Sequence, residues 1–210
     1  MRTVLQVALL CVAVGIGYLI FTSIQRPIDF EKQKLVRNSA VIERLKDIRK
    51  AEMAFKEVNG RFTGDWDTLI NFVKYDSLRI VRKVGTLTDS MVEKGINEKK
   101  AMQLGLIIRD TIRESVLKNV FPRGFNPDQL KVVPVPDTTA YFHLGATVIS
   151  TGSGISVPVF EAKVHNNVVL RELDRQLVIN LNDQRRIQKK YPGLKVGSLT
   201  EANNNAGNWE

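Results

Sequence analysis

The chain has 210 residues and a formal net charge of +9, from 31 Lys and Arg against 22 Asp and Glu. One cysteine and two histidines do not provide a disulfide framework or a zinc site built from Cys and His. Most of the excess charge precedes residue 124, since residues 28–123 hold 20 basic against 14 acidic side chains and residues 124–210 hold 9 against 8. The basic residues are not interleaved with stacking aromatics, so we expect no nucleic-acid partner.

The first predicted element is an almost uninterrupted apolar run from Val4 to Phe21. A helix of this length covers about 27 Å, close to the roughly 30 Å hydrocarbon core of a bilayer. A cleaved signal peptide and a lipid-modified cysteine are the alternatives. A signal peptide has a shorter apolar region followed by a small-x-small cleavage site, which does not stand out here, and Cys11 lies in the middle of the run. We therefore predict a transmembrane signal anchor over residues 1–26, which makes membrane lipids a partner.

The charges on either side of this run bear on its orientation. Arg2 precedes the run, and four basic residues follow it, at Arg26, Lys32, Lys34 and Arg37. This count favours a cytoplasmic body under the positive-inside rule. Asp29 and Glu31 interrupt the basic residues, however, and so short a tail before the run is typical of signal anchors whose body faces outward. We expect a single span in the bacterial inner membrane with the body in the periplasm.

Residues 27–59 have the periodicity of an amphipathic helix. Apolar residues recur three, four or seven apart, at Val41, Leu45, Ile48, Phe55 and Val58. The transmembrane helix is expected to continue into this amphipathic helix as one long spine, and Pro27 either kinks the spine or starts a new helix. The pair Asn59-Gly60 suits a left-handed helix cap. This membrane-proximal helix is expected to pack against the protein's own body, with a partner helix as the alternative.

Residues 60–197 are predicted to form an α+β body. A short helix over 66–74, capped by Thr63 or Asp65, precedes a polar helix or loop over 88–101 that carries Met91 and Val92. The remaining segments are short apolar or alternating runs between turns. They predict an antiparallel sheet with strands at 78–84, 106–116, 130–135, 141–149, 155–164 and 177–181. A short helix is expected over 183–190, and residues 198–210 form a polar C-terminal tail.

Catalytic and metal-binding constellations are missing from the sequence. His143 and His165 have no further ligand type at a motif spacing, and no nucleophile or phosphate-loop motif is present. Asp65 and Asp67 could act as acid and base, but helix capping is the simpler interpretation. We expect no enzyme activity, no catalytic or metal-binding residues and no cofactor.

Two surface features are candidates for partner binding. On a helix, Arg185, Arg186, Lys189 and Lys190 would form one basic face, which is either solvated or binds an anionic partner such as lipid headgroups or an acidic protein. Trp209, the penultimate residue, either docks on its own fold or inserts into a partner's pocket.

The segment from Ala40 to Phe55, followed by Asn59-Gly60-Arg61-Phe62-Thr63 and Leu69, resembles the end of a type II secretion pseudopilin spine helix. The resemblance covers residues 40–75 and implies a pilin-like architecture, in which a small antiparallel sheet packs on the spine. It does not extend to the apolar run, which lacks the glutamate found at its fifth position in pseudopilins.

The whole chain resembles a family of uncharacterised single-span envelope proteins of Bacteroidota. The resemblance lies in residues 59–63, 107–112, 159–163, 191–201 and 209–210. It implies an inner-membrane anchor with a periplasmic domain and no particular biochemical activity. Together these observations predict a non-enzymatic, membrane-anchored envelope scaffold that binds partner proteins, with homo-oligomers as one form. The alternative is an anchored ligand-binding or sensory module for a peptide, lipid or glycan.

Overall fold

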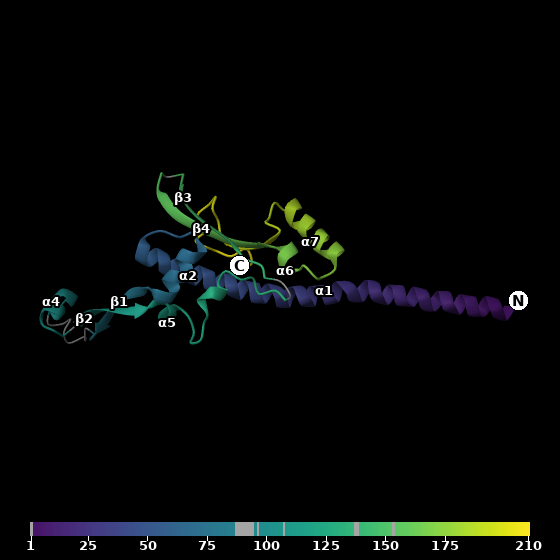
Figure 1. Cartoon of the computed structure of the whole chain (residues 1–210), viewed down its shortest axis with the longest axis horizontal. Helices are drawn as coiled ribbons and strands as arrows, with labels where there is room; N and C mark the ends of the chain where they lie inside the picture. The colour runs from purple at the N-terminus through teal and green to yellow at the C-terminus, as the bar shows by residue number, and fades with distance from the viewer. Residues whose placement is uncertain (1, 87–94, 96, 107, 137–138, 153) are drawn as a thin grey trace.

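The computed structural model describes residues 2–86, 95, 97–106, 108–136, 139–152 and 154–210. Its first element, α1 (Arg2–Asn59), is one helix of 58 residues that projects far beyond the body on its N-terminal side (Figure 1). The ten large apolar side chains from Leu9 to Ile24 are each 53–68 % exposed. Among the described residues, α1 is the one helix long and apolar enough to cross a membrane. An apolar surface of this size requires a cover such as lipid or a partner protein.

Pro27 lies inside α1, so the apolar helix continues into the amphipathic helix as predicted, and the alternative of a new helix beginning at Pro27 is wrong. A proline removes one helical hydrogen bond, to the carbonyl four residues earlier. The neighbouring hydrogen bonds of a long helix hold the chain on either side of that gap. The apolar segment and the part of α1 that carries the body are consequently one continuous element.

The body packs on the second half of α1. Val41, Leu45 and Ile48 are fully buried and Phe55 is 6 % exposed, as the amphipathic pattern predicted. Val58 is 44 % exposed, because the last turn of the helix reaches the edge of the body. Gly60 follows with φ 72°, the left-handed conformation predicted for the helix end.

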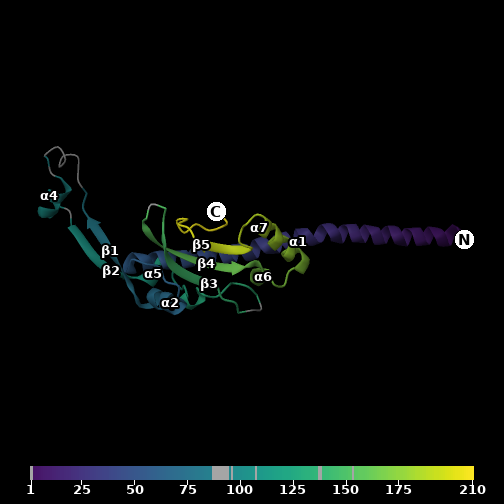
Figure 2. The ribbon, with the colours of Figure 1, turned by 90° about the horizontal axis from the view of Figure 1, so that it is seen from above.

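The helix α2 (Trp66–Tyr75) confirms the second predicted helix, and Asp65 caps it by accepting a hydrogen bond from the Thr68 N–H over 2.8 Å. Strands β1 (Ser77–Val84) and β2 (Ile108–Ser115) then pair antiparallel as a two-stranded sheet. With the short helix α4 (Glu98–Gln103) they form a projection that we call the arm, which comprises the described residues between 77 and 115. The arm points away from the N-terminal end of α1 in both views (Figures 1 and 2). Met91 and Val92 lie outside the described residues.

Strands β3 (His143–Ser150), β4 (Ser156–His165) and β5 (Gly193–Gly197) form the second antiparallel sheet, in the order β3-β4-β5. Its inner face contributes Phe160, Ala162 and Val196 to the core beside α1. The helices α6 (Asn166–Val169) and α7 (Arg175–Ile187) connect β4 to β5. A five-residue helix, α5 (Val116–Val120), and a 3-10 turn, η1 (Pro127–Gln129), lie between β2 and β3. The molecule is therefore α+β, with a long apolar N-terminal helix followed by antiparallel sheets.

Three predicted elements differ from the structure. Residues 130–135 form one isolated bridge, Val132 to Tyr141, rather than a strand, because Pro134 has no N–H to give to a ladder. Residues 177–181 lie inside α7, where Leu177 and Leu181 face α1 one helical turn apart. The helix expected over 183–190 is the end of α7, which stops at Ile187 before Lys189 adopts φ 55°.

Candidate functional site

The predicted basic cluster lies at the end of α7. Arg186, Lys189 and Lys190 are exposed and Arg185 is half-buried, while Arg186 forms an ion pair with Asp183 at 3.3 Å. The inner face of α7 packs beside residues 27–31 of α1, where a cavity of about 190 Å³ separates the two helices. The cluster thus belongs to the part of the body nearest the apolar segment of α1 (Figure 1).

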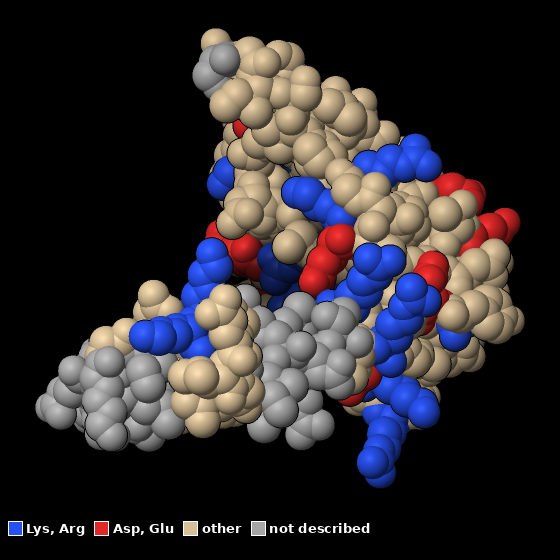
Figure 3. All heavy atoms as spheres, turned by 90° about the vertical axis from the view of Figure 1, so that its left-hand side faces the viewer, with Lys and Arg blue, Asp and Glu red and all other residues tan. Residues whose placement is uncertain are grey.

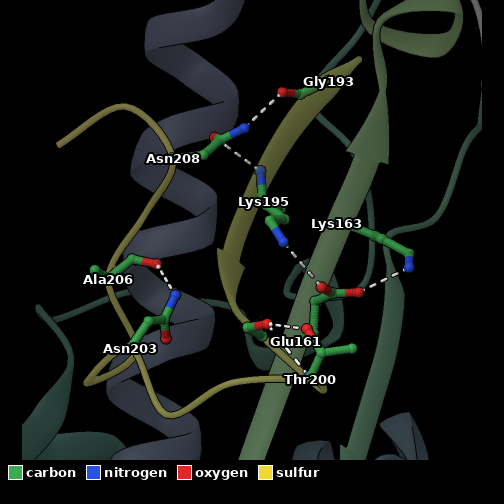
Figure 4. A network of polar contacts seen from close by, with 9 residues as sticks. Glu161, Lys163, Gly193, Lys195, Thr200, Asn203, Ala206 and Asn208 are labelled. Atoms are coloured by element: carbon green, nitrogen blue, oxygen red, sulfur yellow. Dashed lines mark hydrogen bonds and ion pairs between the residues drawn. The ribbon is translucent and has the colours of Figure 1, made fainter. Parts of the chain in front are cut away.

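Trp209 docks on the protein's own fold, where it is half-buried against the core. The segment around it runs along β5 as an added edge. Asn208 donates its N–H to the Lys195 carbonyl over 3.0 Å, and its side chain accepts from the Lys195 N–H and donates to the Gly193 carbonyl (Figure 4). Glu210 completes the contact with an ion pair to Arg49 on α1, at 2.7 Å. The structure therefore does not join Trp209 and the basic cluster into one exposed surface.

A polar network lies on the face of the three-stranded sheet that points away from α1. Glu161 on β4 is 7 % exposed and forms ion pairs with Lys163 at 2.7 Å and Lys195 at 3.4 Å (Figure 4). Burial opposes ionisation of Glu161, but the hydrogen bond and charge of Lys163, followed by Lys195, hold its pKa below the usual value. The carboxylate of Glu161 is thus paired with two lysines, one on its own strand and one on β5, so the network links the two strands.

Neither histidine has the surroundings of a metal ligand. His143 is exposed at the start of β3, and the Nδ1 atom of His165 accepts a hydrogen bond from the Asn167 N–H over 3.1 Å, as a cap of α6. Burial, and then the charge of Arg186, lower the pKa of His165. Among the described residues there is no group of three His, Cys, Asp or Glu side chains that could hold a metal ion.

Glu52 is a buried carboxyl group that the sequence analysis did not single out. It lies on α1 with no exposed surface, and one oxygen accepts a hydrogen bond from the Thr63 N–H over 3.1 Å. Burial raises the pKa of Glu52 to about 8, and the Thr63 hydrogen bond opposes this shift. The other oxygen has no hydrogen-bond partner among the described residues. Glu52 lies four residues after Ile48 and seven after Leu45, on the same face of the helix. This spacing could have predicted its burial from the sequence.

A cleft of about 410 Å³ lies where the arm joins the body. Its lining includes Arg79 of β1, Arg113 of β2 and the carboxylates of Glu57 and Asp76. The register places Arg79 directly opposite Arg113, and both side chains are exposed. Figure 3 views the molecule from this end and shows many more Lys and Arg than Asp and Glu side chains.

Two like charges at directly opposite positions of an antiparallel pair destabilise it. Neither the Arg79 side chain nor the Arg113 side chain has a hydrogen bond or an ion pair with any residue that the structure describes. A guanidinium group presents five N–H donors in a planar fork that matches a carboxylate or a phosphate. The cleft can thus bind an anion without first breaking an internal ion pair of the described residues.

Comparisons with protein-family models, with curated proteins and with solved structures found no match to this chain.

Proposed function

We propose that this protein is a non-enzymatic, membrane-anchored scaffold of the bacterial envelope that binds partner proteins through a periplasmic body. The observation that carries the proposal is the continuity of α1, whose exposed apolar segment and body-bearing half are one helix. A bilayer would cover the apolar segment, and the body would then stand beyond the membrane surface on a stiff stem.

The position of the arm supports the same function. It extends from the end of the body opposite the apolar segment (Figures 1 and 2), where a partner in the envelope can reach it. A cavity of about 800 Å³ beside Met53 of α1 and Asn205 opens widely to solvent, which suits a macromolecular partner better than an enclosed small molecule. We also propose that the arrangement is pilin-like, because a small sheet packs on the second half of a long helix whose first half is apolar.

Anchoring and orientation are tested in cells that produce the full chain. An arginine at the centre of a spanning helix costs about 3 kcal/mol of insertion free energy, so Ile16→Arg should shift the protein from the carbonate-resistant membrane fraction to the soluble fraction. The control is Ile16→Leu, which should stay in the membrane. Protease added to spheroplasts should degrade the body. A fully protected body would overturn the periplasmic orientation.

Partner binding is tested by chemical cross-linking in intact cells, followed by purification of the full chain from detergent extracts. Reproducible cross-links between the body and other envelope proteins are the expected result. A chain that is always recovered alone, as an uncross-linked monomer, would overturn the scaffold function while leaving the anchor in place.

A further inference from the structure

We propose that the cleft at the base of the arm binds an acidic polypeptide segment of a partner, with Arg79 and Arg113 holding its carboxylates. The inference deepens the proposed function and relies on it for the partner being a protein. In the register of the arm, Arg79 on β1 lies directly opposite Arg113 on β2, although the two residues are 34 positions apart in the sequence.

The distance between the two arginines suits carboxylate recognition. Direct cross-strand neighbours have Cβ atoms about 5 Å apart, so the two guanidinium groups can converge on one carboxylate or bind two successive ones. Each Arg–carboxylate contact is bidentate when the planar groups align, which gives stronger binding than a lysine ammonium can. A bound carboxylate would also remove the repulsion between the two positive charges.

The register holds one further pair of opposed basic residues on the arm. Four positions further from the body, position 83 is a lysine and the position opposite it, 109, is an arginine. A second opposed basic pair along the same two strands matches an extended anionic chain better than a single small anion.

Three features of the cleft favour a polypeptide over a nucleic acid. Glu57 and Asp76 line the cleft and would repel a dense row of phosphates, whereas a peptide can offer N–H groups to them. Among the described residues, no aromatic side chain lines the cleft for base stacking. Each strand of the arm also pairs with one described strand only, so each has an edge to which an extended peptide can add.

The experiment measures binding of a fluorescent hexaglutamate peptide to the full chain in nanodiscs of zwitterionic lipid. We expect the double variant Arg79→Gln/Arg113→Gln to weaken binding by about tenfold or more. The matched control is Arg186→Gln/Lys190→Gln, which removes the same charge from the end of α7 and should change the affinity by less than about twofold. The conservative pair Arg79→Lys/Arg113→Lys keeps the charge but loses the bidentate geometry, so its affinity should lie between those of the wild type and the glutamine variant.

Folding of the variants is checked by thermal unfolding. Arg79 and Arg113 are exposed and repel each other, so their removal should leave the unfolding temperature equal or higher. The proposal is overturned if hexaglutamate does not bind at about 1 mM, or if both double variants lose the same affinity. Displacement of the peptide by inorganic phosphate at a lower concentration than by free glutamate would assign the cleft to phosphate groups and overturn it as well.

The same variants separate this inference from the proposed function. Cross-linking to envelope proteins that persists unchanged in Arg79→Gln/Arg113→Gln would refute the cleft as the partner site and leave the scaffold function intact. Loss of hexaglutamate binding in a protein with no cross-linked partner would support the anion-binding cleft and refute the scaffold function.

Discussion

One carboxylate oxygen of Glu52 accepts a hydrogen bond from the Thr63 N–H over 3.1 Å, and this bond ties the loop after α1 to the helix itself. The pKa of Glu52 is about 8 because burial disfavours its charged form. The folded protein therefore keeps this proton at neutral pH, where an exposed glutamate has lost it.

Replacing Glu52 should reveal a pH-dependent cost to stability. Between pH 4.5, its ordinary pKa, and about pH 8, the folded state holds the proton and the unfolded chain does not, so stability falls as the pH rises through this window. The contribution is on the order of 2–4 kcal/mol across the window. Glu52→Gln can still accept from Thr63 and does not titrate, so it should be more stable than wild type near pH 8 and similar to it near pH 5.

Denaturant unfolding of the full chain in a neutral detergent, followed at several pH values, measures this difference. Glu57→Gln, on the same helix but exposed, is the control and should match the wild type. Parallel pH profiles for the wild type and Glu52→Gln would show that Glu52 titrates normally in the folded protein.

Glu161 should show the opposite pH dependence. Its folded pKa is lowered despite burial, because of Lys163 and then Lys195, so it contributes stability above its ordinary pKa of 4.5 and loses it as the pH falls through the lower folded value. Glu161→Gln should lower stability by about 1–2 kcal/mol at neutral pH. At a pH below the folded pKa of Glu161, the variant and the wild type should unfold at the same denaturant concentration. A constant difference at every pH would assign the effect to packing instead.

Trp209 is predicted to stabilise the fold. Trp209→Ala should cost about 2–3 kcal/mol, less than a fully buried tryptophan, because the side chain is half-buried. Hydrogen exchange at the Lys195 amide, which donates to the Asn208 side chain, should become faster in the same variant. Tyr75→Ala removes an aromatic residue that is 81 % exposed and should change the stability by less than about 0.5 kcal/mol. Unchanged stability and exchange in Trp209→Ala would instead leave this residue available for a partner.

Gly197 ends β5 in a conformation that other residues rarely adopt. Its φ is 72°, and a Cβ atom at this position would clash with the backbone carbonyl oxygen of Phe160. Gly197→Ala should destabilise the protein by about 3 kcal/mol or more, measured by thermal unfolding. Gly152→Ala, at a turn with open space around the Cβ position, is the control and should be nearly neutral. Equal melting temperatures for the two variants would contradict this prediction.

Local patterns account for the parts of the fold that were predicted correctly. The stripe from Val41 to Phe55 follows the helical period. Asp65 directly precedes the apolar residues of α2, as an N-cap residue does. The segment 177–181 was misassigned because a short apolar run fits either a strand or a buried helix face. The strand β5 was missed, since it is five residues long and is bounded by Gly193 and Gly197.

The sequence could not reveal the cleft, because the cleft depends on which residues of β1 and β2 lie opposite each other. Arg79 lies between the apolar residues Leu78 and Ile80, and Arg113 follows Ile112 in a mostly polar strand. These local patterns predict only that the two arginines face solvent. Their direct opposition depends on pairing across a long connection, and a shift of one residue would turn one strand's side chains to the other face. The network of Glu161 was hidden for the same reason, since Lys195 belongs to a strand that was not predicted.

The passage of α1 through Pro27 without interruption has a mechanical consequence. A helix of 58 residues is about 87 Å long, and no flexible joint separates the proposed anchor from the body. A change of about 10° in the tilt of the apolar segment, within the range that bilayer thickness imposes, would swing the far end of the helix through about 15 Å. In the proposed membrane arrangement, small changes in the tilt of the apolar segment would thus become large displacements at the arm.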